Sequence, residues 1–214
     1  MRFVTPGILT ICGATNTGKT TLALNILAMK DKLFDDPNIE NVVFYFNHHQ
    51  ELYRNFEKQN IVTRWVHGLP SVEDVKEDTE KYRKSIVVID DFAHQIDNNI
   101  LELFTVLTHH GNIFTIYLTQ FLFGKQPIHR AISLQSTYII LFKNPRDSQQ
   151  IENLARQLKS RNYKYIIDAY NEATKKPYSY ILFDNHQKTD DRVRIRSRML
   201  PNEGPMIAWT QRKI

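Results

Sequence analysis

Short apolar runs alternate with longer amphipathic segments along the chain. The runs at residues 8–12, 41–46, 61–66, 85–90, 113–120 and 137–142 have the length and the β-branched and aromatic content of strands. Segments 19–30, 71–82, 98–110, 147–159 and 163–174 space their apolar residues as helices do. Two late segments, "YSYILFD" and "RVRIRSRM", predict strands at one edge. The alternation predicts an α/β fold with a mostly parallel central sheet and helices on both faces.

Two segments give more local detail. The run "SIVVID" is so apolar that it predicts a strand at the centre of the sheet, buried on both faces. Ser71 stands ahead of Glu73 and Asp74, an arrangement typical of a helix N-cap followed by acidic residues in the first turn.

The segment "GATNTGKT" matches G-x-x-x-x-G-K-[ST] and lies between a predicted strand and a predicted helix. Gly13 and Gly18 let the backbone turn and bring its N–H groups toward a phosphate, while the helix N-terminus attracts the same anion. Lys19 is expected to reach the β- and γ-phosphates of ATP, and the Thr20 hydroxyl to hold Mg²⁺. The predicted nucleotide-binding residues are Gly13, Ala14, Thr15, Asn16, Thr17, Gly18, Lys19, Thr20 and Thr21.

A magnesium ion in such a loop needs an acidic partner at the end of a buried strand. "IVVIDD" supplies Asp90 and Asp91. We expect Asp90 to bind Mg²⁺ through water, and Asp91 to orient and deprotonate the attacking water. Asp91 is one methylene shorter than a glutamate, so it must lie closer to the water or act through a second one.

A polar pair, Thr119 and Gln120, ends the strand "IFTIYLTQ". Polar residues at the carboxyl end of an apolar central strand point to the nucleotide crevice of an α/β sheet. Gln120 is therefore a candidate sensor of the γ-phosphate or of the attacking water.

Composition narrows the class of protein. The chain has 214 residues, one cysteine and a net charge of +5. One cysteine excludes a disulfide framework and a multi-cysteine zinc site. No apolar run reaches the roughly 20 residues of a membrane span, and the N-terminus lacks the apolar stretch of a signal peptide. We therefore expect a soluble, intracellular protein without a membrane partner.

The positive charge gathers near the C-terminus, which suggests a polyanion as partner. If "RVRIRSR" is a strand, alternate residues share a face. The stripe formed by Arg192, Arg194, Arg196 and Arg198 would then meet DNA phosphates, and the intervening residues would face the core. A charged edge that blocks aggregation is the alternative interpretation.

These motifs in this order resemble the genome-packaging ATPases of the FtsK/HerA superfamily, and especially those of Polinton/Maverick elements and adintoviruses. The specific part of the resemblance is "FKNPRD" followed by "QIENLARQ", together with the "LTQ" strand. It spans about residues 8–200. We expect residues 1–200 to form the P-loop ATPase domain and residues 201–214 to form a basic tail.

The resemblance implies a RecA-like sheet, ATP hydrolysis with Mg²⁺, and a homo-oligomeric ring, a hexamer or a pentamer, that threads double-stranded DNA into a capsid. It also implies contact with capsid vertex proteins and a location in an infected host cell, in the nucleus or the cytoplasm, with transient attachment to the virion. By position, Lys19 and Thr20 hold nucleotide and metal, Asp90 and Asp91 form the hydrolysis motif, and Gln120 is the sensor.

One position departs from the family. Related motors place an arginine just before the sensor strand, where it reaches the ATP of the neighbouring subunit. Here the segment reads "THHGN", with His109 and His110 in that place. Arg130 and Arg146 are the nearby candidates for this trans-acting arginine.

Three other functions remain open on sequence grounds. A nucleotide kinase shares the loop but needs an arginine-rich lid and an acceptor pocket. A replicative helicase shares it and acts on one strand. An ATP-binding module would use the nucleotide as a switch without turning it over.

Overall fold

A computed structural model of the chain describes residues 2–92, 95, 98–104, 112–124, 127–159 and 161–211. In this part of the chain one nine-stranded sheet has the strand order β3-β2-β4-β5-β1-β6-β7-β8-β9. The strands are β1 (Gly7–Cys12), β2 (Asn41–Phe46), β3 (Arg64–His67), β4 (Ser85–Asp90), β5 (Ile113–Thr119), β6 (Tyr138–Phe142), β7 (Tyr180–Asp184), β8 (Ile195–Ser197) and β9 (Ile207–Ala208).

The first six strands in this spatial order, β3-β2-β4-β5-β1-β6, pair in parallel. Strands β7, β8 and β9 continue the sheet with antiparallel pairing. The prediction of a P-loop NTPase fold with a mostly parallel sheet is confirmed. "SIVVID" is fully buried between β2 and β5, as its apolar run predicted. The sheet places β5 between β1 and β4, the two strands that carry the glycine loop and the acidic pair.

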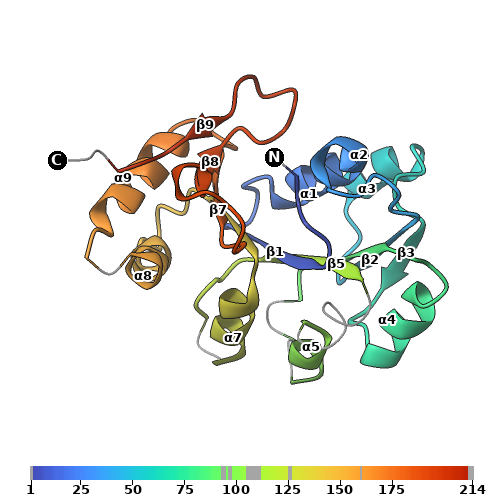
Figure 1. The fold of residues 1–214 in the computed structure, drawn as a ribbon. Coiled ribbons are helices and arrows are strands. Elements are labelled where there is room, and N and C mark those ends of the chain that lie inside the picture. Colours follow the sequence, from blue (N-terminus) through green and yellow to red (C-terminus); the bar gives the residue numbers. More distant parts are fainter. Residues whose placement is uncertain are drawn as a thin grey trace.

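Helices cover both faces of the sheet (Figure 1). One face carries α1 (Lys19–Ala28), α2 (Lys30–Leu33) and α3 (Glu51–Glu57), and the other carries α4 (Val72–Thr79), α5 (Asn98–Glu102) and α7 (Pro127–Gln135). Helices α8 (Gln149–Leu158) and α9 (Lys164–Ala173) pack beside the antiparallel strands. No helix in the described ranges is long and apolar enough to span a membrane.

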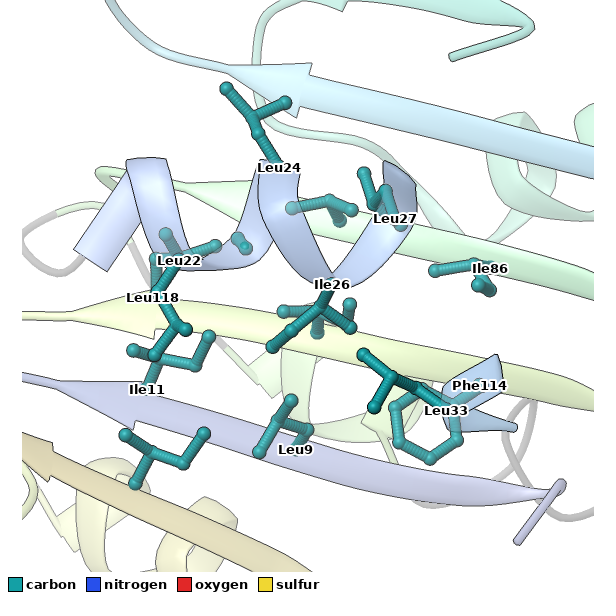
Figure 2. Packing of buried hydrophobic residues seen from close by; sticks show 14 of the residues in the cluster. Leu9, Ile11, Leu22, Leu24, Ile26, Leu27, Leu33, Ile86, Phe114 and Leu118 are labelled. Atoms are coloured by element: carbon teal, nitrogen blue, oxygen red, sulfur yellow. The ribbon is translucent and has the colours of Figure 1, made fainter. Parts of the chain in front are cut away.

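The alternation of side chains along the strands divides the core between the two faces. Ile86 and Val88 of β4 pack in the cluster with α1, whereas Val87 and Ile89 pack in the cluster with α4 and α5. Figure 2 shows Leu22 and Ile26 of α1 lying over the strands of their face. Full burial of each such side chain stabilises the fold by about 1.5–3 kcal/mol, so α1 is held firmly against the sheet that carries its loop.

Helix boundaries follow local signals in some places and not in others. Ser71 caps α4 and forms a capping box with Asp74, as its position predicted. The helix expected over 19–30 is interrupted at Met29, and α2 begins at Lys30. Helix α7 was not predicted, although Ile128, Ala131 and Ile132 stand at helical spacing in this short segment. Residues 105–110 of the helix expected over 98–110 lie outside the described ranges.

The expected stripe of four arginines is wrong. Only Ile195–Ser197 is a strand, and Asp191–Val193 is a 3₁₀ helix. Arg192 pairs with Asp190, and Arg194 donates to Asp191 and to two backbone carbonyls. Arg196 lies within this strand, and its side chain is buried rather than exposed.

Arg196 forms a buried ion pair with Asp184 of β7. Leu182 lies opposite Arg196 in the antiparallel ladder, so Asp184 projects from the same face of the sheet as Arg196. Both side chains are almost fully removed from solvent. The arginine therefore stabilises the junction of β7 and β8 and is not available to DNA.

The segment after residue 200, expected as a tail, contributes to the same sheet. β9 pairs with β8, and Trp209 donates its backbone N–H to Ile195 and its indole N–H to Ser197. The Glu203 carboxylate accepts hydrogen bonds from the Tyr180 hydroxyl and the Leu200 backbone N–H. Residues 201–209 are thus joined to β7 and β8 rather than separate from the domain.

We expect Arg196→Ala to lower the free energy of unfolding by about 3–5 kcal/mol, because it leaves the Asp184 carboxylate buried without its charge partner. Urea unfolding followed by circular dichroism measures this change. Arg192→Ala is the control, because its pair with Asp190 is exposed and screened by solvent, so its loss should change stability little. Equal stability of the two variants would show that the Arg196–Asp184 pair does not hold this part of the sheet.

Candidate nucleotide site

The glycine loop connects β1 to α1 at the carboxyl edge of the sheet. The Gly13 N–H donates to the Thr119 carbonyl of β5 at 3.2 Å, which fixes the start of the loop. A Cβ at Gly13 would lie 2.7 Å from Thr17 Oγ1 and 2.8 Å from Phe142 Cβ, so no larger residue fits. Gly18 has a φ of 96°, a conformation that glycine adopts without strain.

Lys19 begins α1 and folds its side chain back over the loop. Its Nζ donates to the Ala14 carbonyl at 2.9 Å. Burial lowers the pKa of Lys19, and the nearby Asp90 carboxylate opposes that shift. The ammonium is therefore partly desolvated, and its hydrogen-bond partner among the described residues is a neutral loop carbonyl. A charged phosphate oxygen can replace this carbonyl with a stronger bond.

Asp90 ends β4 and is buried under the loop. Its Oδ2 accepts hydrogen bonds from Thr20 Oγ1 at 3.1 Å and from the Tyr53 hydroxyl at 2.9 Å. Burial raises the pKa of Asp90, while these two donors act in the opposite direction. The contact between Thr20 and Asp90 brings together the two oxygen donors that the sequence assigned to Mg²⁺.

Asp91 follows in a left-handed conformation, with a φ of 66°. Aspartate tolerates this conformation better than most residues do. Asn47, just after β2, donates its side-chain amide to the Asp91 carbonyl at 3.1 Å and its backbone N–H to the Asp90 carbonyl at 3.3 Å. These bonds hold the turn after β4, at which the Asp91 side chain borders the cavity.

One cavity of about 900 Å³ collects most of the predicted site. Of the sequence-predicted residues, it is lined by Thr15, Asn16, Gly18, Lys19, Thr20, Thr21, Asp90, Asp91 and Gln120. Gln120 directly follows β5 and reaches the cavity between the glycine loop and the acidic pair, as expected for a strand that separates β1 from β4. The catalytic roles assigned to these residues stay predictions.

The cavity also contains residues that the sequence did not single out. Gln50, just before α3, lines it. Tyr53 is buried behind the lining and reaches the site through its hydrogen bond to Asp90. Tyr178 and Glu203 line the cavity from the antiparallel side. The parallel pairing of β2 with β4 could have located Tyr53, since residues that follow β2 lie beside Asp90. No sequence pattern indicates Tyr178 or Glu203.

The candidate trans-acting arginines lie outside this cavity. Arg130 is exposed on α7, and Arg146 is exposed in the loop after β6, where its backbone N–H bonds to Asn144. Neither is among the described residues that line the cavity. His109 and His110 fall outside the described ranges.

The donor set fits a magnesium–nucleoside triphosphate. The Thr20 hydroxyl and the Asp90 carboxylate supply the hard oxygen ligands that Mg²⁺ prefers. The loop supplies backbone N–H groups, the α1 N-terminus and the Lys19 ammonium for the phosphates. Bound there, Mg²⁺ would neutralise charge on the β- and γ-phosphate oxygens.

No family model matches the chain, and no curated protein matches it. Among solved structures, the DNA-packaging ATPase of Sulfolobus Turreted Icosahedral Virus is similar over 90% of this chain and 96% of its own, with a TM-score of 0.60 and 17% sequence identity. An ATPase from the type III secretion system of pathogenic bacteria is similar over 65% of this chain and 52% of its own, at a TM-score of 0.45 and 13% identity. The first likeness supports the fold assignment, and the second adds nothing to it.

Tyr53→Phe should weaken the binding of Mg²⁺ with nucleotide by about tenfold, because Asp90 loses a donor that orients it. Titration of Mg²⁺ against the fluorescence of a labelled nucleotide measures the change. Tyr45→Phe is the matched control, since the Tyr45 hydroxyl bonds to Asp78 and not to the site. Identical Mg²⁺ titrations for the two variants would contradict the role given to Tyr53.

Proposed function

We propose that the chain is an ATP-driven translocase of double-stranded DNA that packages a viral or virus-like genome. The observation that carries the proposal is the cavity in which the glycine loop faces Asp90, Asp91 and Gln120. A glycine loop alone would suit a switch that only binds nucleotide. The adjacent carboxylates add the groups that hydrolysis requires.

Each group has a definite task in the proposed reaction. Lys19 exchanges the Ala14 carbonyl for the phosphates and stabilises charge that develops on them. Asp90, oriented by Tyr53 and Thr20, holds the metal position. Asp91 accepts the proton of the attacking water, which Gln120 orients from the end of β5.

Two observations support DNA packaging as the use of this hydrolysis. The fold matches that of a viral DNA-packaging ATPase over nearly the full length of both chains. The segments "LTQ" and "FKNPRD" carry the resemblance to the FtsK/HerA packaging motors. They lie at the carboxyl ends of β5 and β6, where Gln120 and Phe142 line the cavity. Within an infected host cell such a motor would act at a capsid vertex.

A ring of identical subunits completes the proposed site. Arg130 and Arg146 lie outside the cavity of their own chain, and both are exposed. A cation supplied by a neighbouring subunit would stabilise the γ-phosphate during transfer. In GTPases such an arginine is worth about 10³–10⁵ in rate.

The central test measures ATP hydrolysis with and without duplex DNA. We expect duplex DNA to stimulate turnover, with little dependence on sequence and a steep loss as salt rises, because the motor grips phosphates. Lys19→Ala should abolish hydrolysis, whereas Asp91→Asn should bind ATP and fail to turn it over.

Different outcomes would contradict different parts of the proposal. Wild-type turnover in Asp91→Asn would remove Asp91 as the base. Nucleotide binding without any turnover in the wild-type chain would identify a switch module, and stimulation by single strands alone would identify a helicase.

The trans-acting arginine is tested by mixing subunits. We expect Arg146→Ala or Arg130→Ala to lose DNA-stimulated hydrolysis as a pure protein. Mixing with Asp91→Asn protein should restore part of the activity, because a mixed ring pairs an intact Asp91 site with an intact arginine. Activity per subunit should also rise with protein concentration as rings form. Full activity of both arginine variants would place the cation elsewhere.

A further inference from the structure

The cavity has two ends that differ in chemistry. At one end lie the carboxylates Asp90 and Asp91, with Gln120 beside them. At the other end, on the antiparallel side of the sheet, lie Tyr178, Tyr180 and Glu203. The glycine loop and the start of α1 run between the two ends. A nucleotide whose phosphates occupy the loop and whose metal meets Asp90 therefore directs its base toward the second end.

Tyr178 offers an aromatic surface there. It stands just before β7 in a left-handed conformation, with a φ of 63°, and the residue is 73% exposed. The Tyr178 ring lies beside the loop, because a Cβ added to Gly18 would be 3.5 Å from Tyr178 Cδ1. An exposed ring at the mouth of a nucleotide cavity is suited to stacking on a base.

Glu203 offers a fixed acceptor. The Tyr180 hydroxyl donates to Glu203 Oε2 at 2.6 Å, and the Leu200 N–H donates to the same oxygen at 3.0 Å. Burial and the bond to Glu203 raise the pKa of Tyr180, so the hydroxyl stays protonated and remains the donor. Both bonds end on Oε2, and no hydrogen bond to Oε1 is found within the described part of the chain, so Oε1 can accept from a ligand.

We propose that this end of the cavity reads adenine: Tyr178 stacks on the base, and Glu203 Oε1 accepts a hydrogen bond from the exocyclic amine. The same position in guanine carries a carbonyl oxygen, which a carboxylate repels. This inference rests on the proposed function, because it needs phosphates in the glycine loop. It makes Glu203, which lies in the segment 201–214 expected from sequence to be a basic tail, part of the substrate site.

Glu203→Gln gives a directed test. The Tyr180 hydroxyl and the Leu200 N–H both require an acceptor, so the glutamine must turn its oxygen toward them. Its amide nitrogen then faces the base and donates where Glu203 accepted. The substitution keeps the local hydrogen bonds and reverses the polarity that the base meets.

Equilibrium binding is measured with the non-hydrolysable β,γ-imido analogues of ATP and GTP and with inorganic tripolyphosphate. We expect the wild-type chain to prefer the adenine analogue, and Glu203→Gln to reduce the adenine-to-guanine affinity ratio by about tenfold. Tyr178→Leu should weaken both analogues by about tenfold, whereas Tyr178→Phe, which keeps the ring, should bind as the wild type does. Tripolyphosphate affinity should be unchanged in all of these variants. Glu152→Gln, on the exposed side of α8, is the control.

An unchanged affinity ratio in Glu203→Gln, with both analogues and tripolyphosphate still bound, overturns the base-reading role alone. Equal losses for tripolyphosphate and for the analogues would reduce Glu203 and Tyr178 to structural roles and overturn it as well. A wild-type chain that binds neither nucleotide nor tripolyphosphate overturns this inference together with the proposed function.

Discussion

Hydrogen-bond ladders on both sides of β5 hold the candidate site together. On one side Cys12 of β1 pairs with Thr119, and on the other Asp90 of β4 pairs with Leu118. Because all three strands are parallel, their carboxyl ends meet at one edge of the sheet. The glycine loop, Gln120 and the acidic pair therefore come together although β5 separates β1 from β4 in the strand order. A slip of one residue in either ladder would turn the strand side chains to the opposite face.

Burial sets the chemistry of the groups that this alignment collects. Lys19 and Asp90 are both partly or fully withdrawn from water, which disfavours the charge on each. Each is held by neutral partners, the Ala14 carbonyl for the lysine and two hydroxyls for the carboxylate. Such a site gains more from a ligand that carries both a dication and phosphate charge than a solvated site would, since the attraction is less screened.

The sequence was informative where function and local geometry coincide. Three features could be predicted because each depends on residues that are close together in the chain. They are the glycine loop, the apolar strand before Asp90 and the cap at Ser71. The arginine segment was misread because alternation tells which residues share a face but not what covers that face. Asp184, which neutralises Arg196, comes from another strand. Glu203 escaped notice for a similar reason, since the hydroxyl that donates to it belongs to Tyr180 of β7, more than twenty residues earlier in the chain.

The two margins of the sheet differ from its interior. β3 has four residues, with Arg64 and His67 exposed at its ends, and β9 has only two residues. Short, charged border strands present few free backbone groups to another chain. Continuation of the sheet from one copy to the next is thereby disfavoured. If several copies assemble, short edges favour contacts made by helices and loops, which can slide or rotate against each other, whereas a shared sheet would lock the copies together.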